Sequence, residues 1–178
     1  ESFKKYRGEA AYKFLGKTFT FGQVDDASKA MAAFLQSQGL ERGDRVAVML
    51  PNVPQYAVAV AAILRAGYVV VNVNPLYTPR ELEHQLKDSG SKLIIIFENF
   101  ATTLQQVIER VPTKKVVLAA MGDMLGFLKG MIVNHVVRNV KKLVPAYALP
   151  GSVKFNDAVA NGRSKPYTAP TIGPNDVA

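Results

Sequence analysis

Short continuous hydrophobic runs alternate along this chain with longer stretches in which hydrophobic residues recur every three or four positions. The continuous runs occupy residues 45–50, 68–71, 92–97 and 115–119. Runs of this kind are typical of strands that are covered on both faces in a parallel sheet. The intervening stretches at 20–38, 56–64, 78–88 and 100–111 have the spacing or the length of buried helices.

Two of these helices begin with a recognisable capping signal. Thr20 is followed three residues later by Gln23, and Thr78 is followed by Pro79 and Glu81. A threonine hydroxyl at such a position accepts a hydrogen bond from the third helical amide, and the glutamine or glutamate side chain bonds back to the cap. Helix starts are therefore predicted at both threonines.

This order of elements predicts the fold class α/β, with a mostly parallel, open sheet and helices on both faces. Crossovers between the parallel strands are expected to be right-handed. Two short runs at 11–14 and 17–19, separated by Leu15-Gly16, predict a hairpin at the edge of the fold. The helix at 56–64 is apolar nearly all round, so we expect it to be sandwiched inside the protein.

The pattern changes over residues 122–144. Gly122, Gly126 and Gly130 are spaced as in helices that approach closely, and a basic amphipathic helix of about a dozen residues follows, ended by Pro145. Asn134, Arg138 and Lys141 are expected on its polar face. The expected apolar face consists of Ile132, Val133, Val136, Val137, Val140, Leu143 and Val144.

The length and composition allow one compact unit, since the chain has 178 residues of which 48% are hydrophobic. We expect an α/β subdomain over residues 1–161, which includes the 122–144 segment, and an extended connector over 162–178. The absence of cysteine excludes a disulfide framework and thiolate chemistry, and it favours a reducing, cytoplasmic location.

The charge is unevenly distributed. Lysine and arginine exceed aspartate and glutamate by 22 − 14 = 8, and no acidic residue occurs between Asp123 and Asp157. A basic segment of this kind attracts an anionic membrane surface or nucleic acid, or it is simply a solvated helix face. Because no aromatic residues are interleaved with these charges, we do not expect nucleic-acid binding.

Candidate chemistry is sparse. Neither usual glycine-rich phosphate motif is present. His84 and His135 are each expected on a helix without a partner histidine or cysteine, so a metal site is not expected. Asp25-Asp26 lies near a helix start, where carboxylates favour the helix dipole.

Asn72, Asn74 and Pro75 stand where a parallel strand is expected to end. Open sheets bind ligands outside the carboxyl ends of their strands, so these residues are candidates for a wall near the substrate. Asparagine and proline are also the residues that a turn between a strand and a helix requires. The sequence leaves both interpretations open.

Several motifs resemble those of the acyl-adenylate-forming ligases. Leu64-Arg65-Ala66-Gly67 is similar to the Leu-Lys-Ala-Gly motif of that family. Residues 18–24 resemble its early Thr-Tyr-x-Glu-Leu motif, with Phe21 in place of tyrosine, and residues 43–52 resemble the strand and turn that follow. Residues 175–178 resemble the run that leads into the phosphate-binding loop. Within the family, the likeness is to the bacterial-type long-chain fatty-acid–CoA ligases.

The resemblance implies the first subdomain of an enzyme that activates a fatty acid with ATP to an acyl-adenylate and then transfers the acyl group to coenzyme A. It implies ATP, Mg²⁺ and coenzyme A as cofactors of the whole enzyme. The family's phosphate loop and its catalytic residues follow later in the chain, so no catalytic, cofactor-binding or metal-binding residue is assigned here. The chain alone is expected to be inactive and to bind none of these cofactors.

The α/β fold class also admits two functions other than that of a ligase. A free-standing doubly wound module that binds a partner without catalysis is the main alternative, because this fold hosts many functions. A receiver-type phosphoacceptor is less favoured, since no predicted strand ends in aspartate.

Membrane contact is a further expectation, because long-chain fatty acids partition into membranes. Arg138, Lys141 and Lys142 would each add about 1 kcal/mol of attraction to an anionic surface. We therefore expect peripheral attachment at the inner face of the cell membrane. Apolar surface left exposed on the chain would favour self-association, so a homodimer is also among the expected assemblies.

Overall fold

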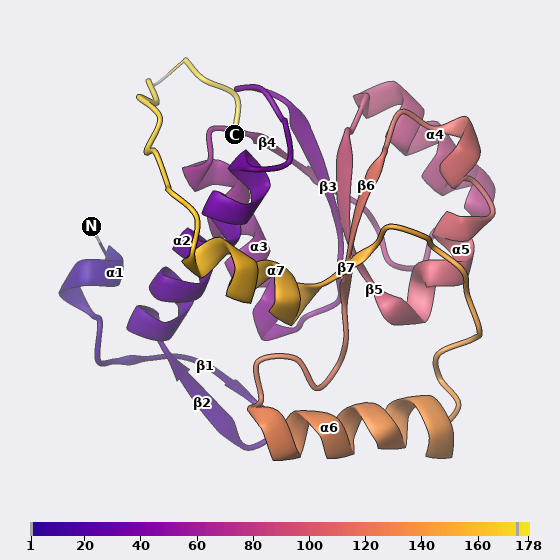
Figure 1. Cartoon of the computed structure of the whole chain (residues 1–178), viewed down its shortest axis with the longest axis horizontal. Coiled ribbons are helices and arrows are strands. Elements are labelled where there is room, and N and C mark those ends of the chain that lie inside the picture. The colour runs from indigo at the N-terminus through magenta and orange to yellow at the C-terminus, as the bar shows by residue number, and fades with distance from the viewer. Residues whose placement is uncertain (1, 174) are drawn as a thin grey trace.

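A five-stranded parallel sheet forms the centre of the molecule, in a computed structural model that describes residues 2–173 and 175–178. Pro174, within the expected connector, lies outside the described residues. The strand order is β4-β3-β5-β6-β7 (Figure 1). The strands are β3 (Arg45–Met49), β4 (Val69–Asn72), β5 (Leu93–Phe97), β6 (Lys115–Ala119) and β7 (Val153–Lys154). The predicted α/β class with a parallel sheet is confirmed.

Helices cover both faces of this sheet, as Figure 1 shows. On one side lie α2 (Phe21–Gln36), α3 (Pro54–Arg65) and α7 (Phe155–Arg163), and on the other lie α4 (Pro79–Ser89) and α5 (Ala101–Gln105). Alternate residues of one strand enter different cores, because side chains of a strand point to opposite faces. Val46 and Val48 belong to the first core, whereas Ala47 and Met49 belong to the second.

The predicted helix caps are confirmed. The Thr20 hydroxyl accepts from the Gln23 amide at 3.2 Å, and the Gln23 side chain accepts from the Thr20 amide at 3.0 Å. Thr78 and Glu81 make the same reciprocal pair at the start of α4. These local bonds satisfy backbone donors that have no partner inside a helix, which is why both starts were readable from sequence.

The predicted hairpin is confirmed as β1 (Ala10–Phe14) and β2 (Lys17–Thr20), which form a separate two-stranded antiparallel sheet. A short helix, α1 (Ser2–Lys5), precedes it. The helix α3 has one fully buried face, with Val58, Ala59 and Ala62 inaccessible to solvent. Its other face is half-buried and lines an open apolar depression, so the sandwiched position is only partly confirmed.

The prediction of one helix over residues 100–111 is wrong. The segment consists of a 3₁₀ turn at Glu98–Phe100, α5, and a second 3₁₀ turn at Ile108–Arg110. Val107 and Val111 are buried in the second core, and Val111 has an extended backbone. Burial of both valines against the sheet outweighs the local preference for a continuous helix.

Two elements near the end of the chain were missed. The strand β7 has only two residues, and α7 contains Asn156, Asn161 and Gly162, which are weak helix formers. Beyond α7 the described residues, 164–173 and 175–178, form no helix or strand, and contacts bind them to the body of the protein. Gln36 and Thr168 exchange two hydrogen bonds, and the Tyr167 hydroxyl donates to the Arg65 carbonyl at 3.1 Å.

The amphipathic helix also starts earlier than predicted. It consists of α6 (Phe127–His135), which continues as a π-helical turn, η3 (Val136–Val140). In the described part of the chain, no helix combines the length and the apolar character needed to cross a membrane.

A buried carboxylate joins α2 to α3. Asp25 is 3% exposed, and its side chain accepts hydrogen bonds from Lys29 at 2.7 Å and from Arg65 of α3. Burial raises the pKa of Asp25, but the two cations outweigh that effect and hold it below the usual range. The simple helix-dipole interpretation of this residue was therefore incomplete, because Asp25 is an interhelical ion-pair partner.

The close packing of α7 on α2 depends on Gly162. A Cβ atom at this position would lie 1.8 Å from the Ala30 carbonyl oxygen. We expect Gly162→Ala to lower the free energy of unfolding by about 3 kcal/mol, since the helices would have to separate. Gly8→Ala is the control, because a Cβ there meets nothing within 4 Å. Urea unfolding followed by circular dichroism measures both, and equal stability of the two variants would contradict the expectation.

Candidate functional site

The carboxyl edge of the sheet is the place where this topology positions a site. The chain passes from β3 to β4 on one side and then crosses to β5 on the other side of β3. Connections that diverge in this way leave a crevice outside the carboxyl ends of the strands, where open α/β sheets bind ligands. Four segments meet at this edge, namely those that follow β3, β4, β5 and β6.

Asn72, Asn74 and Pro75 lie at the end of the edge strand β4, as expected. The Asn72 side-chain oxygen accepts from the Tyr56 hydroxyl at 2.9 Å, and its carbonyl accepts from the Gln85 amide group at 2.8 Å. The Asn74 side-chain oxygen accepts from the Leu76 amide at 3.0 Å, which is the geometry of an Asx turn. These bonds account for both asparagines as turn residues, and a role in ligand contact remains a prediction.

Glu98 directly follows β5 and is 2% exposed. It is bound by Arg138, whose Nε lies 3.0 Å from each carboxylate oxygen and whose Nη2 lies 2.7 Å from Oε2. The hydrogen bonds to Glu98 raise the pKa of Arg138. A buried carboxylate needs such a partner, so this pair fixes the segment around η3 against the end of β5.

Asp123 closes the turn after β6 and is 7% exposed. Its carboxylate accepts from the Ala120 amide at 2.8 Å and from the Asn156 side chain at 3.3 Å. Burial raises its pKa to about 6, and the nearby charge of Glu98 acts in the same direction. Gln55, fully buried at the start of α3, donates to the Ala120 and Asp123 carbonyls. The edge therefore contains two close, buried carboxylates in different charge environments.

Sequence reasoning missed Glu98, Asp123 and Gln55. The available signal was an acidic residue directly after a continuous hydrophobic run, as at Phe97-Glu98. A polar residue there must either meet solvent or find a partner, because the strand delivers it to the edge of the core. The partner Arg138 is 40 residues away, so its identity could not be read from local pattern.

The structure separates the three basic candidates. The guanidinium of Arg138 faces inward to Glu98, whereas Lys141 and Lys142 are exposed beyond the end of η3. Most of the expected apolar face of the helix lies away from the protein interior, which agrees with the interfacial rather than the core-packing alternative. Of its seven residues only Val137 is buried, and Ile132, Val140 and Leu143 are exposed. The reason is that Glu98 and the turn after β6 bind the polar side of the helix.

Among the described residues, no group of three histidine, aspartate or glutamate side chains lies close enough to hold a metal ion. His135 is exposed and its Nδ1 lies 3.1 Å from the Asn139 amide nitrogen, and His84 lies on α4. The carboxylates after β5 and β6 are already bonded to protein groups.

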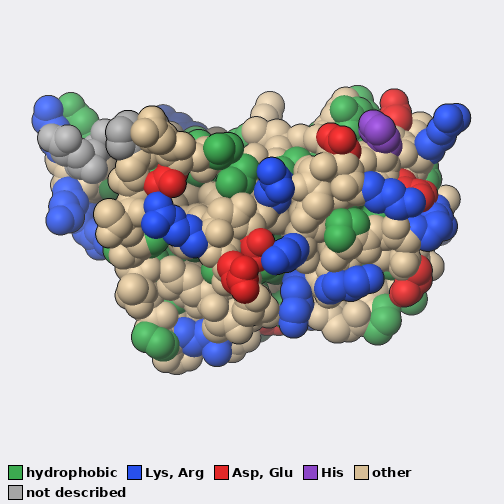
Figure 2. All heavy atoms as spheres, turned by 90° about the horizontal axis from the view of Figure 1, so that it is seen from above, with side chains coloured by type: hydrophobic (Ala, Val, Ile, Leu, Met, Phe, Trp, Pro, Cys, Tyr) green, Lys and Arg blue, Asp and Glu red, His purple; other side chains and the backbone are tan. Residues whose placement is uncertain are grey.

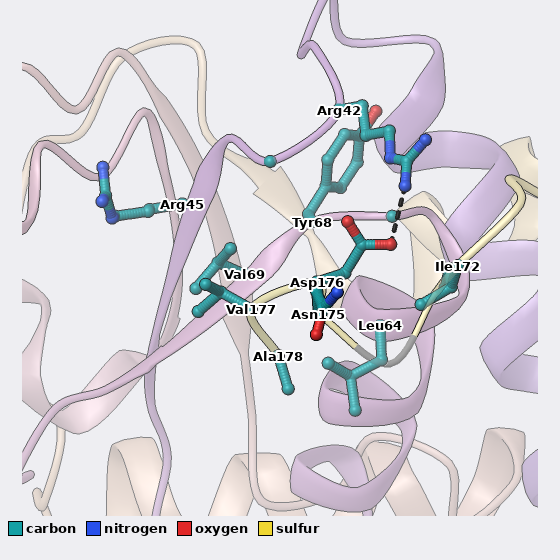
Figure 3. Close-up of a pocket in the computed structure, with 12 residues that line it drawn as sticks. Arg42, Arg45, Leu64, Tyr68, Val69, Ile172, Asn175, Asp176, Val177 and Ala178 are labelled. Atoms are coloured by element: carbon teal, nitrogen blue, oxygen red, sulfur yellow. Dashed lines mark hydrogen bonds and ion pairs between the residues drawn. The ribbon is translucent and has the colours of Figure 1, made fainter.

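A cavity lies at the opposite, amino edge of β3 and β4 (Figure 3). It has a volume of about 480 Å³ and is formed where Ile172 and residues 175–178 lie beside Tyr68 and Val69. Arg42 pairs with Asp176 at 2.7 Å across it. This cavity belongs to the docking of the tail, and it is on the side of the sheet away from the expected ligand crevice.

Comparison with known proteins gives a consistent result. The profile of the family described as AMP-binding enzyme matches residues 1–178. A long-chain-fatty-acid–CoA ligase of Escherichia coli O6:H1 is 49% identical over 100% of this chain and 32% of its own length. The corresponding ligase of Haemophilus influenzae is 48% identical over 98% of this chain and 31% of its length. The chain thus spans about a third of the curated relatives it matches.

Solved structures agree in fold. An anthranilate CoA ligase in complex with anthranoyl-AMP superposes with a TM-score of 0.75 over 98% of this chain and 29% of its own, at 17% identity. A putative long-chain-fatty-acid CoA ligase from Rhodopseudomonas palustris superposes with a TM-score of 0.73 over 98% of this chain and 38% of its own, at 16% identity. At this level of identity the likeness concerns the fold.

The raised pKa of Asp123 predicts a pH-dependent loss of stability. Since the folded-state pKa of about 6 exceeds the ordinary 3.8, the folded protein holds a proton that the unfolded chain releases first. As the pH rises from about 4 to about 6, the contribution of Asp123 to the free energy of unfolding therefore falls by about 2 to 3 kcal/mol. Asp123→Asn keeps an oxygen for the Ala120 amide and should remove this decline.

The measurement is the difference in unfolding free energy between Asp123→Asn and the unchanged protein, determined by urea titration from pH 4 to pH 7. Taking the difference cancels the acid groups whose pKa is lowered, such as Asp25 and Asp44. A difference for Asp123→Asn that stays constant across this pH range would contradict the prediction.

The Glu98–Arg138 pair yields a second prediction. Arg138→Gln leaves a buried carboxylate without its partner and should cost about 3 kcal/mol of unfolding free energy. Glu98→Gln combined with Arg138→Gln should cost less than Arg138→Gln alone, because no uncompensated charge remains. Lys87→Gln, which breaks the exposed pair with Glu83, should cost below about 0.5 kcal/mol. Urea unfolding at pH 7 compares the three, and a double variant less stable than Arg138→Gln would exclude the buried-charge explanation.

Proposed function

Because the chain belongs to the AMP-binding enzyme family, we propose that it forms the first α/β part of a long-chain fatty-acid–CoA ligase. Such an enzyme joins a fatty acid to ATP, releasing pyrophosphate and forming an acyl-adenylate. The thiol of coenzyme A then displaces AMP and takes the acyl group. The observation that carries the proposal is the 49% identity to a ligase of this name across the full chain.

In this proposal the chain supplies scaffold and part of the wall near the substrate. The carboxyl ends of β3, β4 and β5 are the matching location, and Asn72, Asn74 and Pro75 are the proposed wall residues. Asn72 is exposed, and the bonds from Tyr56 and Gln85 hold its backbone and side chain in place. Pre-positioned polar groups of this kind orient a ligand at low entropic cost.

The chemistry itself is proposed to depend on residues outside this chain. The carboxyl edge presents the Glu98–Arg138 pair and Asp123, and all three side chains are engaged with protein partners. We therefore assign no catalytic residue, and we expect the 178-residue chain alone to be inactive. A free-standing binding module is the alternative that the same complete core would support.

We also propose a cytoplasmic location with peripheral attachment to the inner face of the cell membrane. The support is the physical state of the substrate, since long-chain fatty acids partition into membranes, together with the basic segment 122–144. The competing proposal is a homodimer, in which exposed apolar surface is buried between two copies of the protein instead of against a membrane.

The test is ATP–pyrophosphate exchange. A polypeptide that carries this chain joined to the further sequence of its relatives should exchange pyrophosphate in the presence of palmitate and much more slowly with acetate or 4-coumarate. The 178-residue chain alone should give no exchange above background. Intact mass, with sequencing of the C-terminal peptide, establishes which of the two species is in hand.

The outcomes separate the candidates. Exchange that depends on palmitate supports the ligase. Exchange only with an aromatic acid would overturn the fatty-acid assignment and retain the family chemistry. No exchange with any acid in the longer polypeptide would favour the non-catalytic module.

A further inference from the structure

The helix formed by α6 and η3 lies across the carboxyl edge of the sheet, along the bottom of Figure 1. Its inner side is made of small and polar residues. Gly130 is buried against Gly122, where an added Cβ would lie 2.2 Å from the Gly130 carbonyl oxygen. The Asn134 side-chain oxygen accepts from the Gly122 amide at 2.6 Å, and Arg138 binds Glu98. These contacts fix the rotation of the helix about its axis.

The outer side of α6 is apolar and exposed. Phe127 is 84% exposed, Leu128 67%, Met131 55% and Ile132 60%. Their spacing places them on one stripe of the helix surface. Of the large hydrophobic side chains exposed in the described part of the chain, half lie between residues 127 and 143. A cluster of exposed apolar side chains of this kind on a protein surface is typical of an interaction site.

The segment that carries this stripe has only basic charged residues. The sequence has no acidic residue from 124 to 156, and Lys141 and Lys142 are exposed beyond η3. The Lys129 ammonium donates to the Leu15 carbonyl and ties the hairpin to the start of α6. By contrast, the face seen from above in Figure 2, opposite α6, carries acidic and basic side chains intermixed, with hydrophobic side chains only scattered among them.

We propose that this apolar stripe, Phe127, Leu128, Met131 and Ile132, enters the surface of an anionic lipid bilayer, with Lys141 and Lys142 over the headgroups. The proposal rests on the proposed function, because it identifies the contact surface of the peripheral attachment suggested above. An exposed apolar stripe flanked by lysines is the arrangement of interfacial helices. The charge complementarity selects an anionic surface as the occupant.

The structure changes which residues are responsible. The sequence pattern assigned the contact to the apolar face from Ile132 to Val144, with Arg138, Lys141 and Lys142 as the cations. In the fold, Val137 is buried and the charge of Arg138 is balanced by Glu98. The contact therefore extends toward the start of the helix, to Phe127, Leu128 and Met131, and of the three basic residues only the two lysines remain available.

The test uses the whole chain and a fluorescent reporter. The sequence contains no tryptophan, so Phe127→Trp introduces the only indole. Vesicles of phosphatidylglycerol and brominated phosphatidylcholine should shift its emission to the blue and quench it, and vesicles of brominated phosphatidylcholine alone should have a small effect. Val177→Trp is the matched control, since Val177 is 76% exposed and the C-terminus lies at the opposite end of the view in Figure 1. Its emission should not change.

Charge and apolar variants complete the test. Lys141→Gln with Lys142→Gln should weaken partitioning to anionic vesicles roughly five-fold for each lysine removed. Phe127→Gln should weaken it about ten-fold or more, through loss of one large apolar side chain. Circular dichroism checks that each variant is folded. Leu76→Gln, an exposed substitution in the turn between β4 and α4, serves as the folded control with unchanged partitioning.

Three results would overturn the proposal. Quenching that is equal for positions 127 and 177, or independent of anionic lipid, excludes a specific lipid contact. A dimer in sedimentation equilibrium that dissociates in Phe127→Gln, without lipid binding, assigns the stripe to a second copy. The third result is an indole at position 127 that iodide cannot quench in the longer, monomeric polypeptide without vesicles. In that case another part of the protein covers the stripe. None of these readouts requires ATP or acyl transfer, so a failed exchange assay and a failed lipid assay are distinguishable.

Discussion

The two central strands β3 and β5 bury side chains on both faces, and the arrangement of the helices follows from that burial. Leu93, Ile95 and Phe97 enter one core, and Ile94 and Ile96 enter the other. Neither face of such a strand can meet water, so each must be covered by helices. The cover consists of α2, α3 and α7 on one side and α4 and α5 on the other, and this two-sided cover leaves the two edges of the sheet as the places where polar groups gather.

At the carboxyl edge, the burial of polar groups organises the neighbouring segments. Glu98 leaves β5 into a site that is nearly inaccessible to solvent, and a carboxylate in such a site requires a cation. Arg138 meets that requirement from a helix far along the chain. The pair, together with the Gly122–Asn134 bond, therefore determines which side of α6 faces the protein, and it leaves the apolar side toward solvent.

The family assignment and the site geometry explain different things. Identity to long-chain-fatty-acid–CoA ligases covers the whole chain, but only about a third of those relatives is matched. The matched part contains a two-sided core and the carboxyl edge of a sheet. Asn72 and Asn74 lie at that edge and are satisfied by turn contacts, while Asp123 and Glu98 close a turn and attach a helix.

The sequence by itself determined the elements whose signals are local. Hydrophobic runs located β3 to β6, and the reciprocal bonds of Thr20 with Gln23 and of Thr78 with Glu81 located two helix starts, because these interactions join residues within one turn. It also placed Asn72, Asn74 and Pro75 at a strand end. Tertiary structure alone decided the break in the helix at 100–111, the addition of β7 and α7, and the rotation of α6. Each of these depends on contacts between distant segments, such as Arg138 with Glu98 and Gly162 with Ala30, whose energies outweigh local preference and leave no periodic trace in the sequence.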